Sequence, residues 1–378
     1  MNIKSLLIGS AAALVAVSGA RAADAIVAAE PEPVEYVRVC DAFGTGFFYI
    51  PGTETCLRID GYVRFRVTGS RNTVGGVEYV YDNTGTAVLG ANNGYLMNVR
   101  ARVNFDARSE TELGTLRGFI RMQSNNGTTN GRGTLFADQA VIQLGGLFMG
   151  YTESAFAALW GGGVGNWGII STDTGGSYAY QRRNQIGYRY DAGAWYAALV
   201  LENDNGQNAN GTPLATNDWM PDVVGVLGVT QGWGGAAMHL GYDESNKAVG
   251  VKGIVQLDVA ATGGTLRVGG FYSNKIANSY GLNLNPFTTE VANWSAGIGY
   301  VQNLTDTLGM EIGYQYLDGF SQAKGGTVRH AHLVQGALSW TPVTNFNVRL
   351  EGSYGQAKGY NGVTGKEASG FMWVRRSF

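Results

Sequence analysis

The chain has 378 residues and a formal net charge of −2, which gives no reason to expect nucleic acid as a partner. Glycine supplies 58 residues and tyrosine 20, while charged residues make up only 15%, against roughly 25% in an average soluble protein. Few charges with many glycines and aromatic residues are typical of a wall that faces lipid on one side and water on the other.

The first 22 residues have the features of a secretory signal peptide. A short basic start at residues 1–4 precedes an apolar run from Leu6 to Val17, and Ala20 and Ala22 form a small-x-small cleavage site. The apolar run is too short to span a bilayer, and no other segment has 18 consecutive apolar residues. We therefore predict a signal peptide at 1–22 and an exported protein without membrane-spanning helices.

Residues 23–56 are predicted to form an N-terminal periplasmic segment that contains both cysteines of the chain, Cys40 and Cys56. A cysteine pair in an exported protein reads as a disulfide, because the periplasm is oxidising. A zinc site is the alternative, but no histidine lies nearby and the spacing is not one that zinc uses. The sequence therefore predicts a disulfide and no metal.

Residues 57–378 consist of segments of about ten residues in which apolar and polar side chains alternate. In the first segment, Leu57, Ile59, Val63 and Phe65 share one face, while Arg58, Arg64 and Arg66 share the other. Period two over this length predicts a β-strand, because successive side chains point to opposite faces. Sixteen such segments are joined by connections that mostly alternate between short and long, as the periplasmic turns and outer loops of membrane barrels do.

We expect these strands to close into an all-β, sixteen-stranded antiparallel transmembrane β-barrel. Closure removes the sheet edge, whose unpaired backbone groups would each cost several kcal/mol in hydrocarbon. A barrel of this size has a lumen too wide for side chains alone to fill, so it holds water. A secreted β-sandwich is the alternative, although it rarely needs this many strands in one domain.

The chain ends on a strand-like segment with a terminal aromatic residue, Phe378. Val374 and Met372 continue the apolar alternation before it, whereas Arg376 interrupts it. This ending resembles the signal that outer-membrane proteins present to the barrel assembly machinery, so that machinery is a predicted partner.

Several motifs resemble the general outer-membrane porins of alpha-proteobacteria, the rhizobial and Brucella type. They are Met1–Leu7, Val34–Ala42, Tyr49–Arg58, Gly61–Arg64, Ser109–Leu116, Ile142–Leu147, Met220–Gly225 and Arg376–Phe378. The resemblance implies homotrimers in the outer membrane of a Gram-negative bacterium, in contact with lipid and lipopolysaccharide. It also implies that the third outer loop folds inward and narrows each pore.

Arginines crowd the face of the first three strands that we expect to line the lumen. They are Arg58, Arg64, Arg66, Arg100, Arg102, Arg108, Arg117 and Arg121, with Arg64, Arg102 and Arg121 near mid-height. Charges of one sign along a pore wall bias which ions pass. Arginines that are merely solvated along a wet wall are the alternative interpretation.

The long connection Thr152–Arg182 is the predicted constriction loop. It is rich in glycine and aromatic residues, and its two acids are Glu153 and Asp173. Trp160 and Trp167 either line the narrowest part of the pore or pack the loop against the wall.

No pattern of a hydrolase, nucleotide-binding site or metal site is present. His239 stands alone in the sequence, and His330 and His332 share a strand face without an adjacent acid or cysteine. We therefore expect no enzyme and no cofactor, but passive diffusion of small hydrophilic solutes and ions. A sugar-specific channel and an adhesin or receptor barrel remain the alternatives.

Overall fold

The computed structural model describes residues 38–81, 87–89, 95–126, 133–169, 178–203, 219–284 and 290–378. The predicted signal peptide at 1–22 lies outside the described residues, as do Asp173 and the predicted N-terminal segment before residue 38. No helix in the described ranges is long and apolar enough to cross a membrane.

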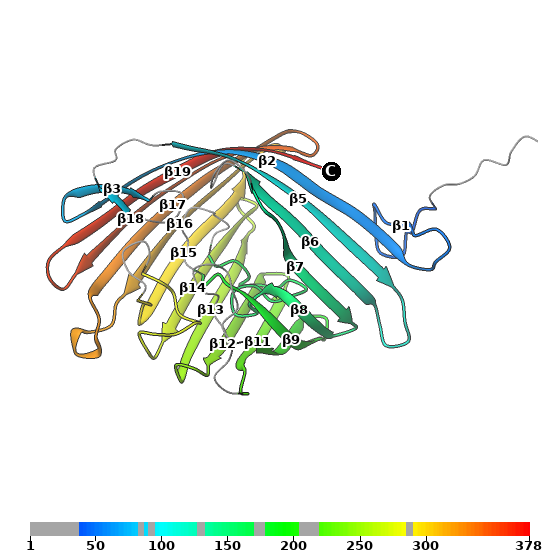
Figure 1. Cartoon of the computed structure of the whole chain (residues 1–378), viewed down its shortest axis with the longest axis horizontal. Helices are drawn as coiled ribbons and strands as arrows, with labels where there is room; N and C mark the ends of the chain where they lie inside the picture. The colour runs from blue at the N-terminus through cyan, green and yellow to red at the C-terminus, as the bar shows by residue number, and fades with distance from the viewer. Residues whose placement is uncertain are drawn as a thin grey trace, which may run out of the picture. The chain divides into compact units, whose positions relative to one another are not determined.

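The described chain forms one antiparallel sheet of nineteen strands, of which sixteen make a closed barrel and three, β1, β3 and β4, are short additions (Figure 1). The barrel strands are β2 (Cys56–Val74), β5 (Tyr95–Ser109), β6 (Leu116–Asn126), β7 (Leu135–Leu144), β8 (Leu147–Glu153), β9 (Arg182–Asp191), β10 (Trp195–Glu202), β11 (Asp222–Gln231), β12 (Gly234–Asp243), β13 (Ala248–Val259), β14 (Gly264–Ser273), β15 (Trp294–Asn303), β16 (Leu308–Asp318), β17 (Val328–Val343), β18 (Phe346–Gly359) and β19 (Thr364–Ser377). The additions are β1 (Phe48–Tyr49), β3 (Val77–Tyr81) and β4 (Ala87–Leu89), and a 3-10 turn, η2, covers Gln322–Lys324.

Each barrel strand pairs with the next one along the chain, and β19 pairs with β2 to close the ring. The final residue completes this seam, because Gly61 and Phe378 exchange two backbone hydrogen bonds of 3.1 and 3.0 Å. Gly61 has no side chain to obstruct the Phe378 ring, which lies 3.0 Å from where a Cβ would be. The predicted sixteen-stranded antiparallel barrel is confirmed.

Alternation along the strands separates an apolar exterior from the interior. In β10, Tyr196 and Val200 are buried inside, whereas Leu199 and Leu201 are exposed. The exterior of the other strands carries the same kind of side chain: Ile59, Val63, Phe65, Met97, Phe105, Ile120, Leu227, Met238, Val268, Ile298, Ile312, Val334, Leu338, Leu350 and Met372. In water these side chains would form large exposed apolar patches, so this exterior suits lipid.

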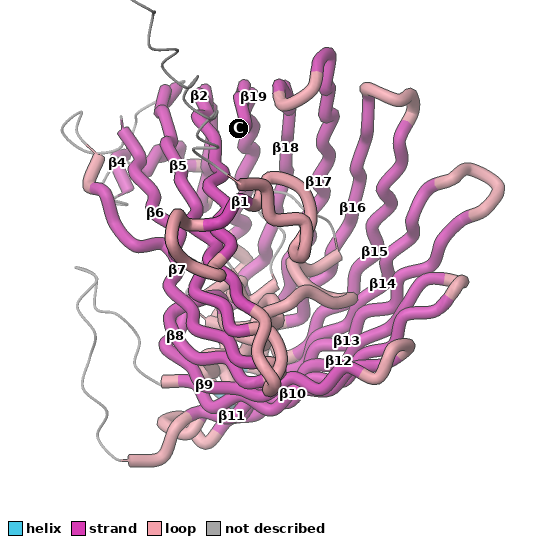
Figure 2. The backbone as a smooth tube through the Cα atoms, turned by 90° about the vertical axis from the view of Figure 1, so that its right-hand side faces the viewer, coloured by secondary structure: helices cyan, strands magenta, loops and turns pink. Residues whose placement is uncertain are grey.

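The strands run side by side around the barrel, with connections at both ends (Figure 2). At one end two to six residues join successive strands, while at the other end most connections are longer, although four residues join β12 to β13 and β18 to β19. The turn between β7 and β8 depends on Gly145, which has φ +55°, and a Cβ there would lie 2.5 Å from the Leu113 carbonyl oxygen. Glycine adopts this left-handed conformation without steric cost. Short and long connections mostly alternate along the chain, as predicted.

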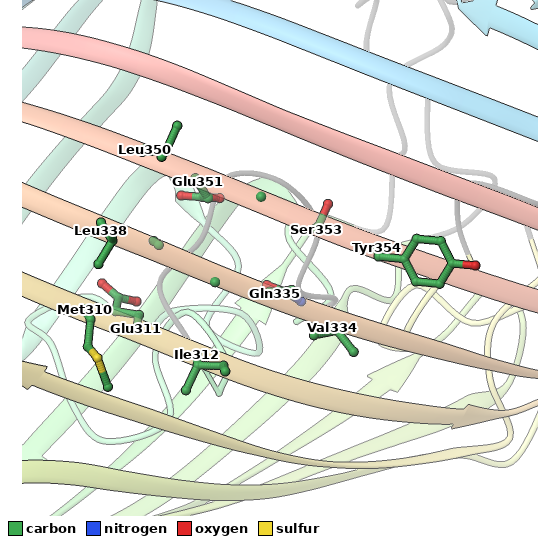
Figure 3. Close-up of a pocket in the computed structure, with 13 residues that line it drawn as sticks. Met310, Glu311, Ile312, Val334, Gln335, Leu338, Leu350, Glu351, Ser353 and Tyr354 are labelled. Carbon is green, nitrogen blue, oxygen red and sulfur yellow. The ribbon is translucent and has the colours of Figure 1, made fainter.

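A shallow apolar groove crosses the exterior of β16, β17 and β18 (Figure 3). Gly336 and Gly352, directly opposite each other, form its floor. In the strand register, Gly370 of β19 lies opposite Gly352, and Gly69 of β2 lies opposite Gly370. A Cβ at Gly69 would meet nothing within 4 Å, so packing within the barrel does not require glycine there.

The N-terminal segment is fastened to β2 by a disulfide between Cys40 and Cys56, whose Cα atoms lie 5.9 Å apart. The predicted disulfide is confirmed. Phe47 packs on the two sulfurs in a small buried cluster, and the guanidinium groups of Arg58 and Arg108 lie 4.9 and 5.1 Å from its ring centre. The segment therefore covers apolar surface at the start of β2.

Candidate functional site

A water-accessible cavity of about 470 Å³ lies in the lumen between the arginine-bearing strands and the connection from β8 to β9. We call it the lumen cavity. Its described lining residues are Tyr62, Arg64, Arg100, Arg102, Arg121, Glu153, Trp167, Tyr180, Arg182, Ser339, Asn347, Arg349, Glu351, Trp373 and Arg375.

The structure brings together most of the residues that the sequence singled out. Arg64, Arg100, Arg102 and Arg121 line the lumen cavity, and Glu153 lines it as well. Glu153 is the last residue of β8 rather than part of the loop, and only 5% of it is exposed. An Arg182 nitrogen lies 3.9 Å from its carboxylate.

The cavity lining also contains three arginines that the clustering on the first strands did not point to: Arg182, Arg349 and Arg375. They lie on β9, β18 and β19, away from the first three strands, where the arginines cluster most densely. Arg349 and Glu351 alternate with the apolar Leu350 on β18, so period two alone puts them on the polar face of that strand. Including Arg349 and Arg375 in the site requires knowing how the barrel closes, because closure pairs β19 with β2 and places β18 next to β19.

Asp138 is the buried counter-charge of this wall. It is 0% exposed, and its carboxylate lies 2.5 Å from Arg182, 3.4 Å from Arg102 and 3.8 Å from Arg121. Asp138 has no partner in the β6–β7 register, which jumps between Arg121 and Met122, so it is the extra residue of a β-bulge. Bulges re-aim side chains in this way, and here the bulge turns an acid into the lumen.

A second charged cluster surrounds Asp106, which is fully buried. Arg108 and Arg117 both donate paired hydrogen bonds to its carboxylate at 2.8 to 3.0 Å, and Arg58 approaches it at 3.6 Å. These arginines do not line the lumen cavity. Arg66 lies outside its lining as well, with its guanidinium carbon 5.4 Å from the Phe371 ring centre. Arg58, Arg66 and Arg117 were predicted to face the lumen and to contribute to selectivity. They lie on the interior wall but outside the lining of the lumen cavity, and their part in selectivity stays a prediction.

We call residues 154–181 loop 3, and its described parts, 154–169 and 178–181, fold into the barrel against β10 to β15. Phe156 is buried among Phe148, Tyr196, Val200 and Val224, and Ile169 is buried beside Ile254. Glycines of the wall leave room for loop 3: a Cβ at Gly297 would lie 2.3 Å from the Ile169 side chain. The predicted inward third loop is confirmed.

Buried polar side chains of the wall hold the backbone of loop 3. The Glu202 carboxylate accepts hydrogen bonds from the Ala155 amide at 2.7 Å and from the Ser154 hydroxyl at 3.0 Å. The fully buried Lys252 ammonium donates to the carbonyls of Ala157 and Gly165 at 3.1 and 2.9 Å. Burying a charge is costly unless it is well paired, so these contacts specify one position for the loop.

His239 and Tyr280 complete the anchor. Nδ1 of His239 lies 2.9 Å from the Ala155 carbonyl, and the Tyr280 hydroxyl lies 3.1 Å from both Glu202 and Asp222. His239, which stood alone in the sequence, thus has a structural position under loop 3. His330 and His332 lie elsewhere, in an aromatic group with Tyr314 and Tyr316 on β16 and β17.

The two tryptophans of loop 3 occupy different environments. Trp160 packs on the wall: its indole nitrogen donates to Gln143 at 3.0 Å, and its ring lies 5.6 Å from that of Phe119. Trp167 lines the lumen cavity with 39% of its surface exposed and contacts Tyr178 edge to face. The sequence left open whether these tryptophans line the pore or pack the loop against the wall. The position of Trp160 supports packing against the wall, and that of Trp167 supports lining the pore.

Within the described residues, no group of three histidine, cysteine, aspartate or glutamate side chains is arranged to hold a metal ion. The cavity instead offers fixed charges around water-accessible space. That arrangement can pass and sort small solutes.

Comparison with known proteins gives a consistent result. The family model described as "Porin subfamily" matches residues 24–373. Porin Omp2b of Brucella suis and of Brucella abortus are each 45% identical over 260 residues. The match covers 64% of this chain and 66% of each relative, just under two thirds of the relatives' length.

Solved structures share the fold at low sequence identity. The outer-membrane channel DcaP of Acinetobacter baumannii superposes with a TM-score of 0.66 at 14% identity, over 87% of this chain and 99% of that one. OmpT of Vibrio cholerae, in a structure described as a trimer form, gives a TM-score of 0.51 at 10% identity, over 86% of this chain and all of that one.

Proposed function

This chain belongs to the porin subfamily, and on that premise we propose that its barrel is a passive diffusion pore for small hydrophilic solutes and ions. The family is one of outer-membrane channels rather than enzymes, and the apolar exterior suits that membrane. The observation that carries the proposal is the lumen cavity, a water-accessible and charged space inside a closed barrel.

Selectivity is set, in this proposal, by the charges around the lumen cavity. Seven arginines and two glutamates are among its described lining residues, and the carboxylates of Asp138 and Glu311 lie just behind them. Seven positive against four negative charges leave an excess of three positive charges. A positive excess at a constriction favours anions over cations.

Liposome swelling tests the proposal and separates it from a sugar-specific channel. A general pore should admit sugars, amino acids and salts at rates that fall smoothly with solute size, because passage depends on the open cross-section. A specific channel should admit one class of sugar far faster than other solutes of equal size. A barrel that serves only as an adhesin or receptor should give no swelling at all.

We also propose that the protein assembles as a homotrimer through the exterior of β17, β18, β19 and β2. Gly336, Gly352, Gly370 and Gly69 form a row there, and small residues let two surfaces approach closely in a membrane. Replacing Gly352 with leucine should shift detergent-solubilised protein from trimer to monomer by light scattering. Gly225, which also has open space around its Cβ position, supplies the matched control Gly225→Leu. A trimer that persists in G352L would place the interface elsewhere. Contacts with lipopolysaccharide, and recognition of Phe378 by the assembly machinery, remain proposals of the same kind.

A further inference from the structure

Three arginines stand side by side in one cross-strand row of the lumen wall. Arg375 on β19 is directly opposite Arg64 on β2, and Arg64 is directly opposite Arg100 on β5. All three line the lumen cavity. Asparagines occupy both ends of the row, with Asn347 opposite Arg375 and Asn125 opposite Arg100.

Such a row is unfavourable as a purely structural device. Directly opposite residues of neighbouring strands have Cβ atoms about 5 Å apart, and like charges at that distance destabilise the pairing. Arg64 is also only 6% exposed, so water screens its charge less than it would at the surface. A position that concentrates positive charge at a cost to stability is a candidate site for an anion.

Aromatic rings of the adjacent rows hold the guanidinium groups in place. Trp373 lies next to Arg375, with 4.9 Å between the guanidinium carbon and the ring centre, and the corresponding distance to Arg64 is 5.9 Å. Tyr62 lies 5.7 Å from Arg375 on the other side. Stacking of this kind fixes the plane of a guanidinium while its edge stays able to donate hydrogen bonds.

The end of the row is fixed by a hydrogen bond, since Nε of Arg100 donates to the Asn125 side-chain oxygen at 2.6 Å. The other end is held as well, because the Asn347 side-chain amide donates to the Ser339 and Thr341 hydroxyls at 3.0 and 2.8 Å. Held donors cost little conformational entropy when a ligand arrives. Guanidinium edges match the geometry of an oxyanion, because each edge presents two parallel N–H groups.

We propose that the row Arg375–Arg64–Arg100 binds a small oxyanion with two negative charges, such as a phosphate group, as it passes the lumen cavity. This inference rests on the proposed pore function and names a substrate class for it. A dianion is favoured over a monoanion because its Coulomb attraction to the row of cations is about twice as large. Binding slows passage, so the oxyanion should act as a saturable blocker of chloride current.

The test records single channels in planar bilayers in KCl at pH 8, where phosphate is mainly a dianion, while inorganic phosphate or sulfate is added. Chloride current should fall to a plateau with increasing phosphate, and with increasing sulfate in the same way. Potassium nitrate at matched ionic strength should block much more weakly, because nitrate carries one charge and is attracted less strongly to the row. Arg64→Gln and Arg375→Gln should each raise the half-blocking concentration about tenfold, the loss expected for a charge-assisted hydrogen bond.

Arg108→Gln is the matched control, because Arg108 belongs to the Asp106 cluster and does not line the cavity. It should leave the half-blocking concentration unchanged. Ohmic channels without saturable phosphate block would overturn the proposed oxyanion site but would still support the proposed diffusion pore. Equal loss of block in R108Q and R64Q would also overturn it, because the block would then reflect total charge. Absence of any channel would overturn the pore itself.

Discussion

Removing residues 161–176 and joining the ends with a short glycine-serine linker should raise single-channel conductance by roughly a factor of two, because the conductance of a water-filled pore scales with its open cross-section. Loop 3 occupies the lumen through Phe156, Ile169 and the backbone carbonyls bound by Lys252. The deletion keeps Phe156 and removes both Ile169, which is buried beside Ile254, and Trp167, which lines the lumen cavity. The variant should also admit larger sugars in liposome swelling.

The barrel should survive this deletion, because the strand ladder and its closure between β19 and β2 do not involve loop 3. A second variant, Lys252→Met, keeps the loop intact but removes both hydrogen bonds to it. Its current should fluctuate more than that of the wild type, since the loop loses a fixed position. A correctly folded deletion variant with wild-type conductance and size limit would place the constriction elsewhere.

Replacing Arg64, Arg102 and Arg121 together with glutamine should shift the reversal potential in a salt gradient toward cation selectivity. The three changes remove the positive excess at the lumen cavity, while Glu153, Glu351 and Asp138 keep their negative charges. Under a tenfold KCl gradient we expect a shift on the order of 10 mV, against the limit of about 59 mV for a monovalent ion.

The matched control for this variant is Arg58→Gln with Arg108→Gln, two arginines of the interior wall that pair with Asp106. Because they lie outside the cavity lining, their loss should change the reversal potential much less. If the triple variant inserts normally and keeps the wild-type reversal potential, these arginines are only solvated along the wall and do not set ion selectivity. An equal shift in the control would assign selectivity to the net charge of the whole lumen.

Where the two sides of a strand meet different media, the sequence predicts the fold well. Ile59 and Arg58, or Leu350 and Arg349, alternate because one faces lipid and the other the lumen. The alternation fails in β11, where Leu227 faces outward and Val224 and Val226 face inward against loop 3. Both sides of that strand are apolar, so its pattern is weak. Only the inward fold of a distant loop explains it.

The alternation of side chains along the strands also predicts part of the candidate site. Arg64, Arg100, Arg102 and Arg121 follow from strict period two on adjacent strands. The lumen-facing position of Asp138 could not be predicted in this way, because the bulge in β7 shifts the alternation of inward and outward side chains by one residue. Counting by twos then assigns every residue on one side of the bulge to the wrong face. The division between Trp160 and Trp167 depends on the path of loop 3, and local sequence does not encode that path.

Single-channel recording of the wild-type protein in planar bilayers tests most directly whether the charged lumen cavity is an open path for water and ions. We expect discrete current steps, linear in voltage at low field and proportional to the bulk conductivity of the salt, with a reversal potential that favours anions. Reconstituted protein that is folded and inserted but gives no current steps would mean that the cavity is closed and that the barrel is not a diffusion pore.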